Sequence, residues 1–334
     1  KDQKIKINYL VGDFNQGSLE EFDQISIHKI YKKSNYKMPL FKGLQFSLNL
    51  IKKIYQLGND IYIQRAAGYQ TGVIALACKI FGKKFIFMTA SETDCNREFI
   101  NSNKKIVGLL YLIGLKLADL VITQSNEHQR FLLENHGINA QILKSSYYLT
   151  EYNNEGKNII LYVATRLEPN KKPELFLKLA NEIPTMKFVL IGKPIESHIE
   201  YSNKIIQESK LIDNLEYIPE LRLMDIDKYY RRAKVFVSTS DFEGFPASFV
   251  QAMANSTPVL SLSVNPDDFL TKYGCGYYAK GDFIRLKKFL VKISNNPEEL
   301  SKMSHKAYKY AKDNHDLEAN TKIFIGLIKD ICVE

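Results

Sequence analysis

Residues 235–260 read VFVSTSDFEGFPASFVQAMANSTPVL and contain, in order, an apolar run, a polar loop, a helical segment and a second apolar run. The run Val235–Thr239 is rich in β-branched and aromatic residues, as in buried strands, and Pro246 suits the first turn of a helix. The second run, Pro258–Ser261, predicts another strand. A strand, a helix and a strand in this order indicate an α/β fold with a parallel sheet.

The same alternation extends away from this stretch through most of the chain. Helical patterns occur at Leu44–Gln56, Gly72–Phe81 and Asn126–His136, and apolar runs of strand length separate them. A parallel sheet with helices on both faces accounts for this order. The further buried strands that we predict are Asp60–Gln64, Lys84–Met88, Leu120–Thr123, Ile159–Val163, Lys187–Ile191 and Leu215–Ile218.

The polar segment Thr150–Asn158, TEYNNEGKN, is the best candidate for a linker. The chain has 334 residues, which is enough for two domains of about 150 residues. We therefore predict two doubly wound, Rossmann-like domains over residues 1–152 and 153–315, and a C-terminal helix over 316–334 that packs back on the first domain. The two sheets are expected to face each other across a cleft, with ligands at the carboxyl ends of the strands.

The composition is that of an ordinary globular protein, with 45% hydrophobic and 25% charged residues. The four cysteines, Cys78, Cys95, Cys275 and Cys332, are scattered without a CxxC pair. This pattern argues against a disulfide framework or a zinc site and fits a reducing compartment. The opening residues, Lys1–Lys4, are not those of a signal peptide, so we expect a cytoplasmic protein.

Positive charge is concentrated in the first half. Residues 1–150 carry 20 Lys and Arg against 12 Asp and Glu, a balance of +8 in a chain whose total is +9. This asymmetry predicts an anionic partner, for which a membrane surface, a lipid-linked substrate and a nucleic acid are all candidates. The apolar run Ile106–Ala118 is too short to span a bilayer. It predicts a buried helix or, alternatively, an interfacial helix with Lys104 and Lys105 facing lipid headgroups.

Two cations follow the strand Ile159–Val163, in the loop ATRLEPNKKP at residues 164–173. Arg166 and Lys171 lie on this strand-to-helix connection, and a helix is expected to begin near Pro173. Two cations beside a helix N-terminus make a site for a diphosphate. A solvated basic loop is the alternative.

A carboxylate and an amide accompany the helix that follows the strand Val235–Thr239. Glu243 lies just before this helix, Ser248 in its first turn, and Gln251 about one and a half turns inside it. Glu243 and Gln251 can hold sugar hydroxyls, while Ser248 and the N–H groups of the first turn can face an anion. Alternatively, Glu243 only caps the helix and Gln251 faces solvent.

The stretch EGFPASFVQAMANSTPVL, residues 243–260, resembles the signature region of glycosyltransferase family 4, also called group 1, whose members are retaining enzymes of the two-domain GT-B fold. The loop ATRLEPNKK resembles that family's glycine–Arg–Leu loop, with a Lys five residues after the Arg. The segments KFVLIGKP (187–194), NLEYIPEL (214–221) and ADLVITQS (118–125) resemble further strands of the family. The likeness covers nearly the whole chain and is strongest in residues 159–262.

The resemblance implies a donor site for a nucleotide-diphosphate sugar. Arg166 and Lys171 would hold the diphosphate and neutralise it as it leaves, and Glu243 would bind the transferred sugar, so these three are the catalytic candidates. Gln251 would bind the ribose hydroxyls. The family uses no cofactor and no obligatory metal, because cationic side chains and a helix N-terminus stabilise the leaving group. The other substrate-binding residues that it implies are Gly192, Lys193, Pro219, Glu220, Leu221, Gly244, Phe245, Pro246 and Ser248.

Several positions depart from the family pattern. Gln251 replaces a second glutamate, residues 263–269 read SVNPDDF where the family has paired glycines, and the family's histidine is missing from residues 85–94. Asp94 is a nearby polar candidate for contact with substrate. Residues 5–31 look like later strands of the domain, and the chain has no initiating Met. We therefore expect the first strand–loop–helix unit to be absent, and transfer to be poor without it.

The resulting hypothesis is a retaining glycosyltransferase that moves a sugar from a nucleotide-diphosphate donor to a glycan or lipid-linked acceptor in surface polysaccharide or glycolipid synthesis. Its basic first half is expected to attach it peripherally to the inner face of the cell membrane. Alternatives are a nucleotide-sugar epimerase or hydrolase of the same fold, and a non-catalytic nucleotide-sugar-binding protein. Nucleic acid is not an expected partner, because the sequence has no zinc spacing, helix-turn-helix pattern or aromatic-basic RNA motif.

Overall fold

The computed structural model describes residues 5–12, 17–31 and 40–333. These residues form two compact units. The first comprises the described residues up to Ile122 together with Leu132–Gln141, and the second comprises Thr123–Phe131 and Ile142–Val333. The domain boundary predicted after residue 152 stays a prediction, as does the packing of segment 316–334 on the first domain.

A six-stranded parallel sheet forms the centre of the second unit. Its strand order is β10-β9-β8-β11-β12-β13, and every neighbouring pair is parallel. The first five strands lie where the sequence predicts them, whereas the three half-buried residues of β13 have no apolar run to reveal them. The strands are β8 (Ile159–Ala164), β9 (Lys187–Gly192), β10 (Leu215–Ile218), β11 (Ala233–Ser238), β12 (Val259–Ser261) and β13 (Gly276–Tyr278).

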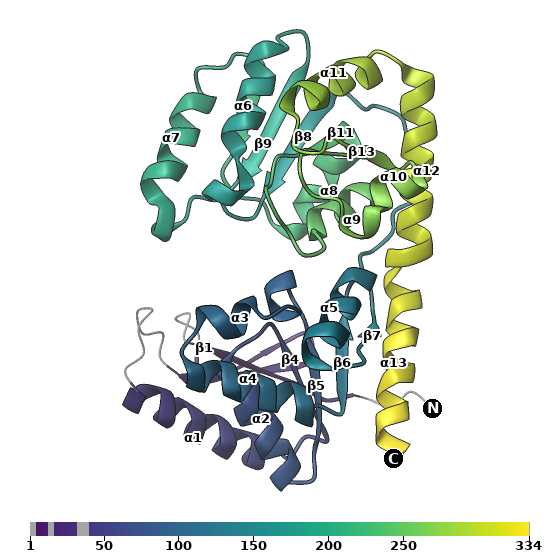
Figure 1. Cartoon of the computed structure of the whole chain (residues 1–334). Helices are drawn as coiled ribbons and strands as arrows, with labels where there is room; N and C mark the ends of the chain where they lie inside the picture. The colour runs from purple at the N-terminus through teal and green to yellow at the C-terminus, as the bar shows by residue number, and fades with distance from the viewer. Residues whose placement is uncertain (1–4, 13–16, 32–39, 334) are drawn as a thin grey trace. The chain divides into compact units, whose positions relative to one another are not determined.

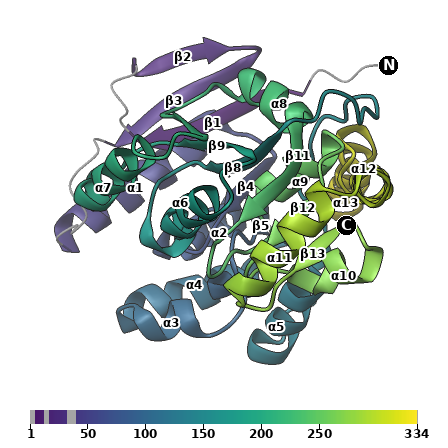
Figure 2. The ribbon, with the colours of Figure 1, turned by 90° about the horizontal axis from the view of Figure 1, so that it is seen from above.

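Both faces of this sheet are apolar and covered by helices, as the alternation of side chains in a strand requires. In β8, Ile159 and Leu161 belong to one core cluster, and Ile160 and Tyr162 belong to the other. The doubly wound architecture predicted for this half is therefore confirmed (Figures 1 and 2). Helices α8 (Leu223–Arg232), α9 (Ala247–Ala254), α10 (Phe269–Tyr273) and α12 (Pro297–His315) contribute to the first cluster, and α6 (Pro173–Glu182), α7 (Ile199–Ser209) and α11 (Phe283–Ser294) to the second.

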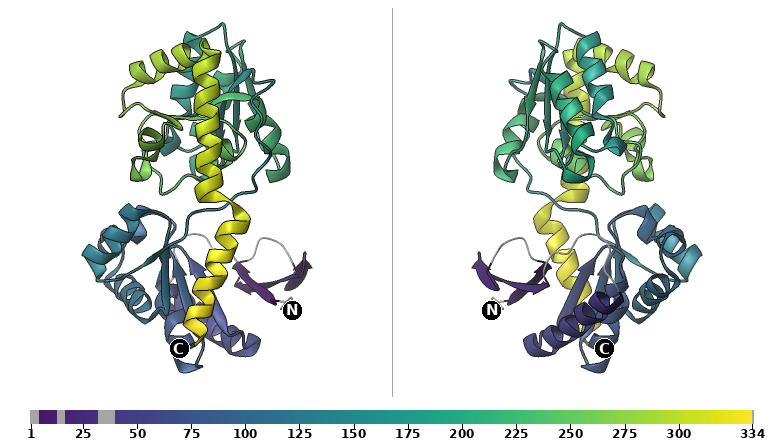
Figure 3. Two further views of the ribbon diagram at one scale, coloured as in Figure 1. Left: turned by 90° about the vertical axis from the view of Figure 1, so that its right-hand side faces the viewer. Right: turned by 90° about the vertical axis from the view of Figure 1, so that its left-hand side faces the viewer.

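Two long helices, α12 and α13 (Leu317–Val333), end the described chain with only Asp316 between them (Figure 3). Asp316 has an extended backbone, with φ −61° and ψ 125°, and this ends α12. Its Oδ1 accepts the N–H of Ala319 at 2.8 Å and so caps the start of α13. One residue thus terminates one helix and begins the next.

The first unit contains a four-stranded sheet with the order β4-β5-β6-β7, in which β4, β5 and β6 are parallel. The strands and helices predicted between residues 44 and 136 are present, with ends that differ by a few residues (Figure 1). The strands are β4 (Ile61–Arg65), β5 (Lys84–Met88), β6 (Leu120–Thr123) and β7 (Gln141–Ile142), and the helices are α1 (Leu40–Leu57), α2 (Tyr69–Ile80), α3 (Glu98–Ser102), α4 (Lys105–Leu117) and α5 (Asn126–His136). Thr123 of β6, residues 126–131 of α5 and Ile142 of β7 belong to the second unit.

Helix α4 accounts for the apolar run at residues 106–118. One side of this helix is buried at Gly108, Tyr111 and Gly114. The opposite side is not, because Ile106 and Leu109 are 56% and 53% exposed. The predicted buried helix is therefore correct for one side only. Within the described ranges, no helix combines the length and the apolar character that crossing a bilayer requires.

Residues before α1 form a separate three-stranded sheet. β1 (Ile7–Gly12) pairs in parallel with β3 (Ile25–Tyr31), while β2 (Leu19–Phe22) pairs antiparallel with β3. Asp23 and Gln24 join β2 to β3 with positive φ angles of 46° and 67°, as in a two-residue hairpin turn. The described residues of the first half therefore form two sheets rather than a single parallel one. The expected absence of an opening strand–loop–helix unit stays a prediction.

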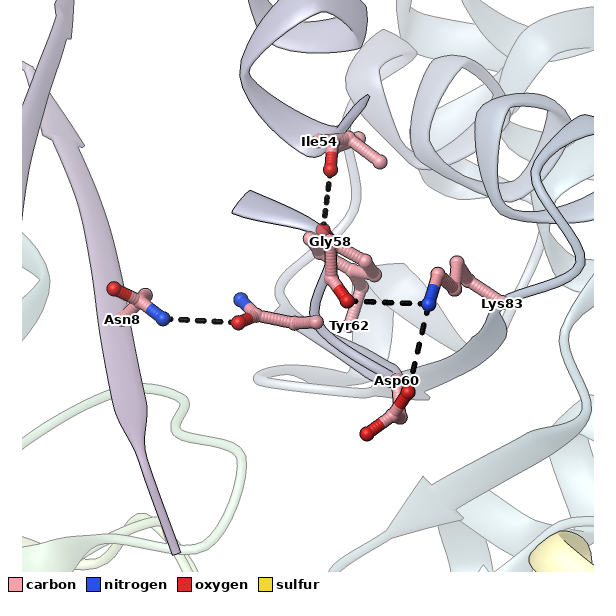
Figure 4. Close-up of polar contacts among 7 residues, drawn as sticks. Asn8, Ile54, Gly58, Asp60, Tyr62 and Lys83 are labelled. Atoms are coloured by element: carbon pink, nitrogen blue, oxygen red, sulfur yellow. Dashed lines mark hydrogen bonds and ion pairs between the residues drawn. The ribbon is translucent and has the colours of Figure 1, made fainter. Parts of the chain in front are cut away.

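A hydrogen bond joins this small sheet to the turn between α1 and β4 (Figure 4). Asn8 Nδ2 in β1 donates to Asn59 Oδ1 at 2.9 Å. The turn itself is held by Lys83, whose Nζ donates to the carbonyl of Gly58 at 3.1 Å, and by the Tyr62 hydroxyl, which donates to a carbonyl of α1 at 2.6 Å. The small sheet is thus hydrogen-bonded to the turn that leads into β4 of the larger sheet.

We expect Gly72→Ala to destabilise the first unit. Helices α2 and α4 cross so closely that a Cβ built on Gly72 lies 2.2 Å from the backbone oxygen of Leu110. Because a backbone oxygen cannot move aside as a flexible side chain can, the free energy of unfolding should fall by about 2–3 kcal/mol. Urea unfolding followed by circular dichroism measures this change.

The matched control for Gly72→Ala is Gly326→Ala in α13. A Cβ built on Gly326 has no described atom within 4 Å. This control should leave the stability unchanged or raise it by up to about 1 kcal/mol, because alanine favours the helix over glycine. Equal stabilities of the two variants would contradict the close crossing of α2 and α4.

Candidate functional site

Two loops meet at the carboxyl edge of the second unit's sheet, because β8 and β11 are parallel neighbours. The first loop, residues 165–172, follows β8, and the second, residues 239–246, follows β11. The backbone N–H of Asp241 donates to the carbonyl of Asn170 at 2.9 Å and ties the loops together. Candidate residues from distant parts of the sequence are thereby brought side by side.

Lys171 and Glu243, two of the three catalytic candidates, form an ion pair across these loops, with Nζ donating to Oε1. The Ser240 hydroxyl donates to the same carboxylate oxygen at 3.0 Å. Both side chains of the pair are largely buried, with exposed fractions of 20% for Lys171 and 21% for Glu243. The pair is therefore more strongly shielded from water than an ordinary surface salt bridge.

The backbone of Lys171 is held by two hydroxyl groups, one from Tyr162 in β8 and one from Thr239 at the start of the second loop. The Thr239 hydroxyl lies 2.8 Å from the carbonyls of Lys171 and Lys172, and the Tyr162 hydroxyl donates to the Lys171 carbonyl at 2.9 Å. Burial raises the pKa of Tyr162 well above its usual value, so the hydroxyl stays a neutral donor. These bonds support Lys172 in a left-handed conformation, with φ 45° and ψ 50°.

Three of these residues, Tyr162, Thr239 and Ser240, were not among the predicted site residues. A signal for two of them exists in the sequence, where the apolar strand that contains Phe236 ends in the polar run Ser-Thr-Ser. Asn170 is a further addition, because its Oδ1 is buried and accepts no hydrogen bond from any residue within the described ranges. It is an acceptor placed between Arg166 and Lys171 in the sequence.

Arg166 lies on the first loop with an exposed side chain. It forms no ion pair with a residue that the structure describes, whereas the two neighbouring lysines are both paired. Lys172 Nζ lies 2.5 Å from Asp241 Oδ1, and Lys171 contacts Glu243. The loops contain three cations and three carboxylates, because Glu168 also lies on the first loop. Arg166, the cation without an ion-pair partner among the described residues, can attract an anion.

The second loop leads directly into α9, which Pro246 precedes without a capping side chain. Gly244 and Ser248 are half-buried, whereas Phe245 and Pro246 are buried. The Phe245 ring stacks on Phe269, with 5.3 Å between ring centroids, so its side chain belongs to the core. These four predicted residues thus gather beside Glu243, and for Phe245 only the backbone remains available to a ligand.

Gln251 points its amide oxygen at the protein interior. Its Oε1 accepts a hydrogen bond from the Tyr230 hydroxyl at 3.0 Å. Tyr230 is fully buried, and this burial raises its pKa well above the usual value. The oxygen of Gln251 is therefore engaged, and its amide nitrogen remains as a donor. The predicted ribose contact of Gln251 stays a prediction.

The predicted nucleotide-pocket residues lie at the carboxyl ends of β9 and β10, two neighbouring strands. Gly192 is buried against Leu167, since a Cβ built on it would lie 2.6 Å from Leu167 Cδ2. Lys193 pairs with Glu220 at 2.9 Å, and both side chains are more than half exposed. Their exposure leaves both charged groups able to turn towards a ligand. The two other predicted residues at this end are Pro219, which is exposed, and Leu221, which is half-buried.

Asp94 belongs to the first unit and has a structural role there. It is 4% exposed, and its Oδ2 accepts the N–H groups of Ala90 at 2.7 Å and Ser91 at 3.3 Å. The Tyr111 hydroxyl donates to the Asp94 carbonyl. These bonds account for the buried carboxylate as a cap of the turn after β5, and its contact with substrate stays a prediction. No group of three or more His, Cys, Asp or Glu among the described residues is arranged to hold a metal ion.

Residues 150–322 match the model of a family described as glycosyl transferases group 1. The chain is 24% identical over 276 residues to an uncharacterized glycosyltransferase of Methanocaldococcus jannaschii, which covers 72% of this chain and 65% of that protein. It is 27% identical over 179 residues to a probable sucrose-phosphate synthase of Thermosipho melanesiensis, covering 51% and 41%. The alpha-monoglucosyldiacylglycerol synthase of Acholeplasma laidlawii is 27% identical over 165 residues, covering 46% and 39%. The chain thus spans 39% to 65% of the lengths of these relatives.

Solved structures resemble the chain over almost its full length. A sucrose-phosphate synthase from Thermosynechococcus elongatus superimposes with a TM-score of 0.78 at 15% identity, covering 98% of this chain and 89% of that chain. HepE of Anabaena, in complex with UDP and glucose, superimposes with a TM-score of 0.74 at 14% identity, covering 92% and 86%. These similarities concern the fold, and they confirm the predicted GT-B class.

We expect Thr239→Val to loosen the first loop. Valine keeps the shape of the side chain but removes the hydroxyl that bonds the carbonyls of Lys171 and Lys172. The loss of this buried donor should lower the free energy of unfolding by about 1–3 kcal/mol. Thr239→Ser, which keeps the hydroxyl, is the control, and its free energy of unfolding should fall by less. Chemical denaturation of the two variants compares them, and equal losses would assign the effect to packing instead.

Proposed function

Because the chain belongs to the group 1 glycosyl transferases, we propose that it transfers a sugar from a nucleotide-diphosphate donor with retention of configuration. The observation that carries the proposal is the meeting of Lys171 and Glu243 beside Arg166 at the carboxyl edge of the sheet. A cation for a diphosphate and a carboxylate for sugar hydroxyls are thus in direct contact, and Arg166 lies on the same loop as Lys171. All three residues lie inside the family match.

In the proposed reaction, Arg166 and Lys171 bind the diphosphate and offset the negative charge that grows on it as the glycosidic bond breaks. Glu243 accepts hydrogen bonds from hydroxyls of the transferred sugar and so fixes its position relative to the diphosphate. The N–H groups at the start of α9 add positive potential. With these groups present, the chemistry needs no metal ion to hold the leaving group.

We further propose that the acceptor is a glycan or a lipid-linked molecule and that the protein works at the cytoplasmic face of a membrane. Helices α1, α2 and α4 of the first unit contact one another in that order. No Asp or Glu occurs within residues 40–57, 69–80 or 105–117. Exposed lysines on these helices are Lys52, Lys79, Lys105 and Lys116, and their exposed apolar residues are Leu44, Leu48, Tyr55, Leu76, Ile80, Ile106 and Leu109. Apolar and cationic groups together suit an anionic lipid surface.

Binding of nucleotides tests the donor site directly. Isothermal calorimetry with UDP, GDP, ADP and CMP and their common sugar conjugates should identify one diphosphate that binds. We expect Arg166→Ala to lower the affinity for that diphosphate by about tenfold or more, because a charge-assisted contact is lost. The matching nucleoside, which lacks phosphate, should bind with unchanged affinity. An equal loss for both ligands would remove Arg166 from the phosphate role, and no binding by any nucleotide would contradict the proposed function.

Vesicle binding tests the proposed membrane surface. Leu48 and Ile80 are 58% and 76% exposed. The double variant Leu48→Glu/Ile80→Glu should lose co-sedimentation with phosphatidylcholine vesicles that contain phosphatidylglycerol, because it adds negative charge to the apolar surface. The control is Leu211→Glu, at a residue of the second unit that is 82% exposed. Equal binding by both variants, or no binding by the unmodified protein, would reject this surface.

A further inference from the structure

We propose that the Lys171–Glu243 ion pair is exchanged when the donor binds, so that the site discriminates in favour of a nucleotide sugar over the free nucleotide diphosphate. The inference rests on the proposed function. It assigns to Glu243 a second role, as a carboxylate that competes with phosphate for Lys171. The two partners lie 72 residues apart in sequence and meet at the edge of one sheet.

The contacts around the pair allow the lysine side chain to move while its backbone stays fixed. The carbonyl of Lys171 is held by the hydroxyls of Thr239 and Tyr162. Among the described residues, the Lys171 side chain has one hydrogen-bond partner, the Oε1 of Glu243. An incoming diphosphate can therefore draw the ammonium group away by side-chain rotation, without rearranging the loop.

When a free diphosphate binds Lys171, the carboxylate of Glu243 loses its ion-pair partner and is poorly solvated. The carboxylate is only 21% exposed, and Ser240 would remain as its single hydrogen-bond donor among the contacts that the structure describes. Breaking a shielded ion pair is unfavourable mainly because one charge is left without a partner. The ion pair therefore makes binding of the diphosphate alone less favourable.

A sugar attached to the diphosphate offsets the loss of the ion-pair partner of Glu243. Its hydroxyl groups can donate to the carboxylate that Lys171 has left, so that both members of the former pair gain new partners at once. The sugar and the diphosphate then bind cooperatively through one exchange, which is a coupling free energy within a single site. After transfer, the sugar is gone and Lys171 can return to Glu243, which favours release of the nucleotide product.

The neighbouring pair Lys172–Asp241 provides a matched comparison. It joins the same two loops, and its nitrogen and oxygen are 2.5 Å apart. Its side chains are 37% and 41% exposed, about twice the exposure of Lys171 and Glu243. Water can therefore solvate the separated charges, and the pair should contribute little to ligand discrimination.

The experiment measures the affinity of UDP and of UDP-glucose for the full chain and for Glu243→Gln and Asp241→Asn, by calorimetry. If UDP does not bind, GDP with GDP-mannose and ADP with ADP-glucose replace it. Both substitutions remove one negative charge from the same loop. We expect Glu243→Gln to bind the free diphosphate about tenfold more tightly than the unmodified chain, because Lys171 no longer has a competing carboxylate. Asp241→Asn should change this affinity by less than about threefold.

The nucleotide sugar should respond differently, since Glu243→Gln also loses the acceptor for sugar hydroxyls. The preference of the Glu243→Gln variant for UDP-glucose over UDP should therefore fall, while Asp241→Asn keeps the preference of the unmodified chain. Unchanged or weaker UDP binding by Glu243→Gln would overturn the exchange, as would an equal gain in both variants, which would indicate a general charge effect. If neither the chain nor a variant binds any nucleotide, the proposed function itself fails.

Glu243→Asp is a second variant that tests the same exchange if Glu243→Gln does not fold. Aspartate keeps the charge but is one methylene shorter, so its carboxylate is drawn back from Lys171. We expect tighter UDP binding than in the unmodified chain here as well, and UDP binding as weak as in the unmodified chain would overturn the exchange. Circular dichroism of each variant establishes that the fold is retained.

Discussion

The parallel pairing of β8 with β11 is the constraint on which the site depends. Parallel neighbours end at the same edge of a sheet, so the loops that follow them must lie together. Residues 171 and 243 meet only because Phe236 of β11 pairs with Leu161 of β8. The Thr239 hydroxyl and the N–H of Asp241 then fasten one loop to the other. A change in strand order would separate the ion pair entirely.

The core on both faces of the sheet gives the loops their rigidity. Leu167 in the first loop is fully buried and packs against Gly192, and Phe245 in the second loop stacks on Phe269. Each loop therefore has one apolar side chain in the core and its charged side chains at the edge. Functional groups held by packed neighbours keep their geometry without a ligand, which lowers the ordering that binding requires. The low exposure of the Lys171 and Glu243 side chains follows from this arrangement.

The fold and the charged residues could be predicted from sequence, whereas the groups that position them could not. Runs such as Ile159–Val163 are long and apolar enough to identify strands, and a motif with Arg166, Lys171 and Glu243 identifies the edge at which they end. Thr239 and Ser240 are small polar residues whose role depends on which loop lies opposite. The contact of Gln251 with Tyr230 likewise depends on how α8 packs against α9. The sheet of residues 7–31 was missed because its antiparallel pair depends on a two-residue turn.

The two loops carry three cations and three carboxylates, and this balance of charge stabilises them. Three cations close together would repel one another, but Glu243 and Asp241 neutralise two of them, and among the described residues only Arg166 of the three is left without an ion-pair partner. A fully cationic site would bind a diphosphate more strongly and would bind substrate and product alike. Carboxylates that pair with the lysines reduce this general attraction. In the proposed exchange, a ligand is selected because it provides partners for both Lys171 and Glu243, as a sugar linked to a diphosphate would and a diphosphate alone would not.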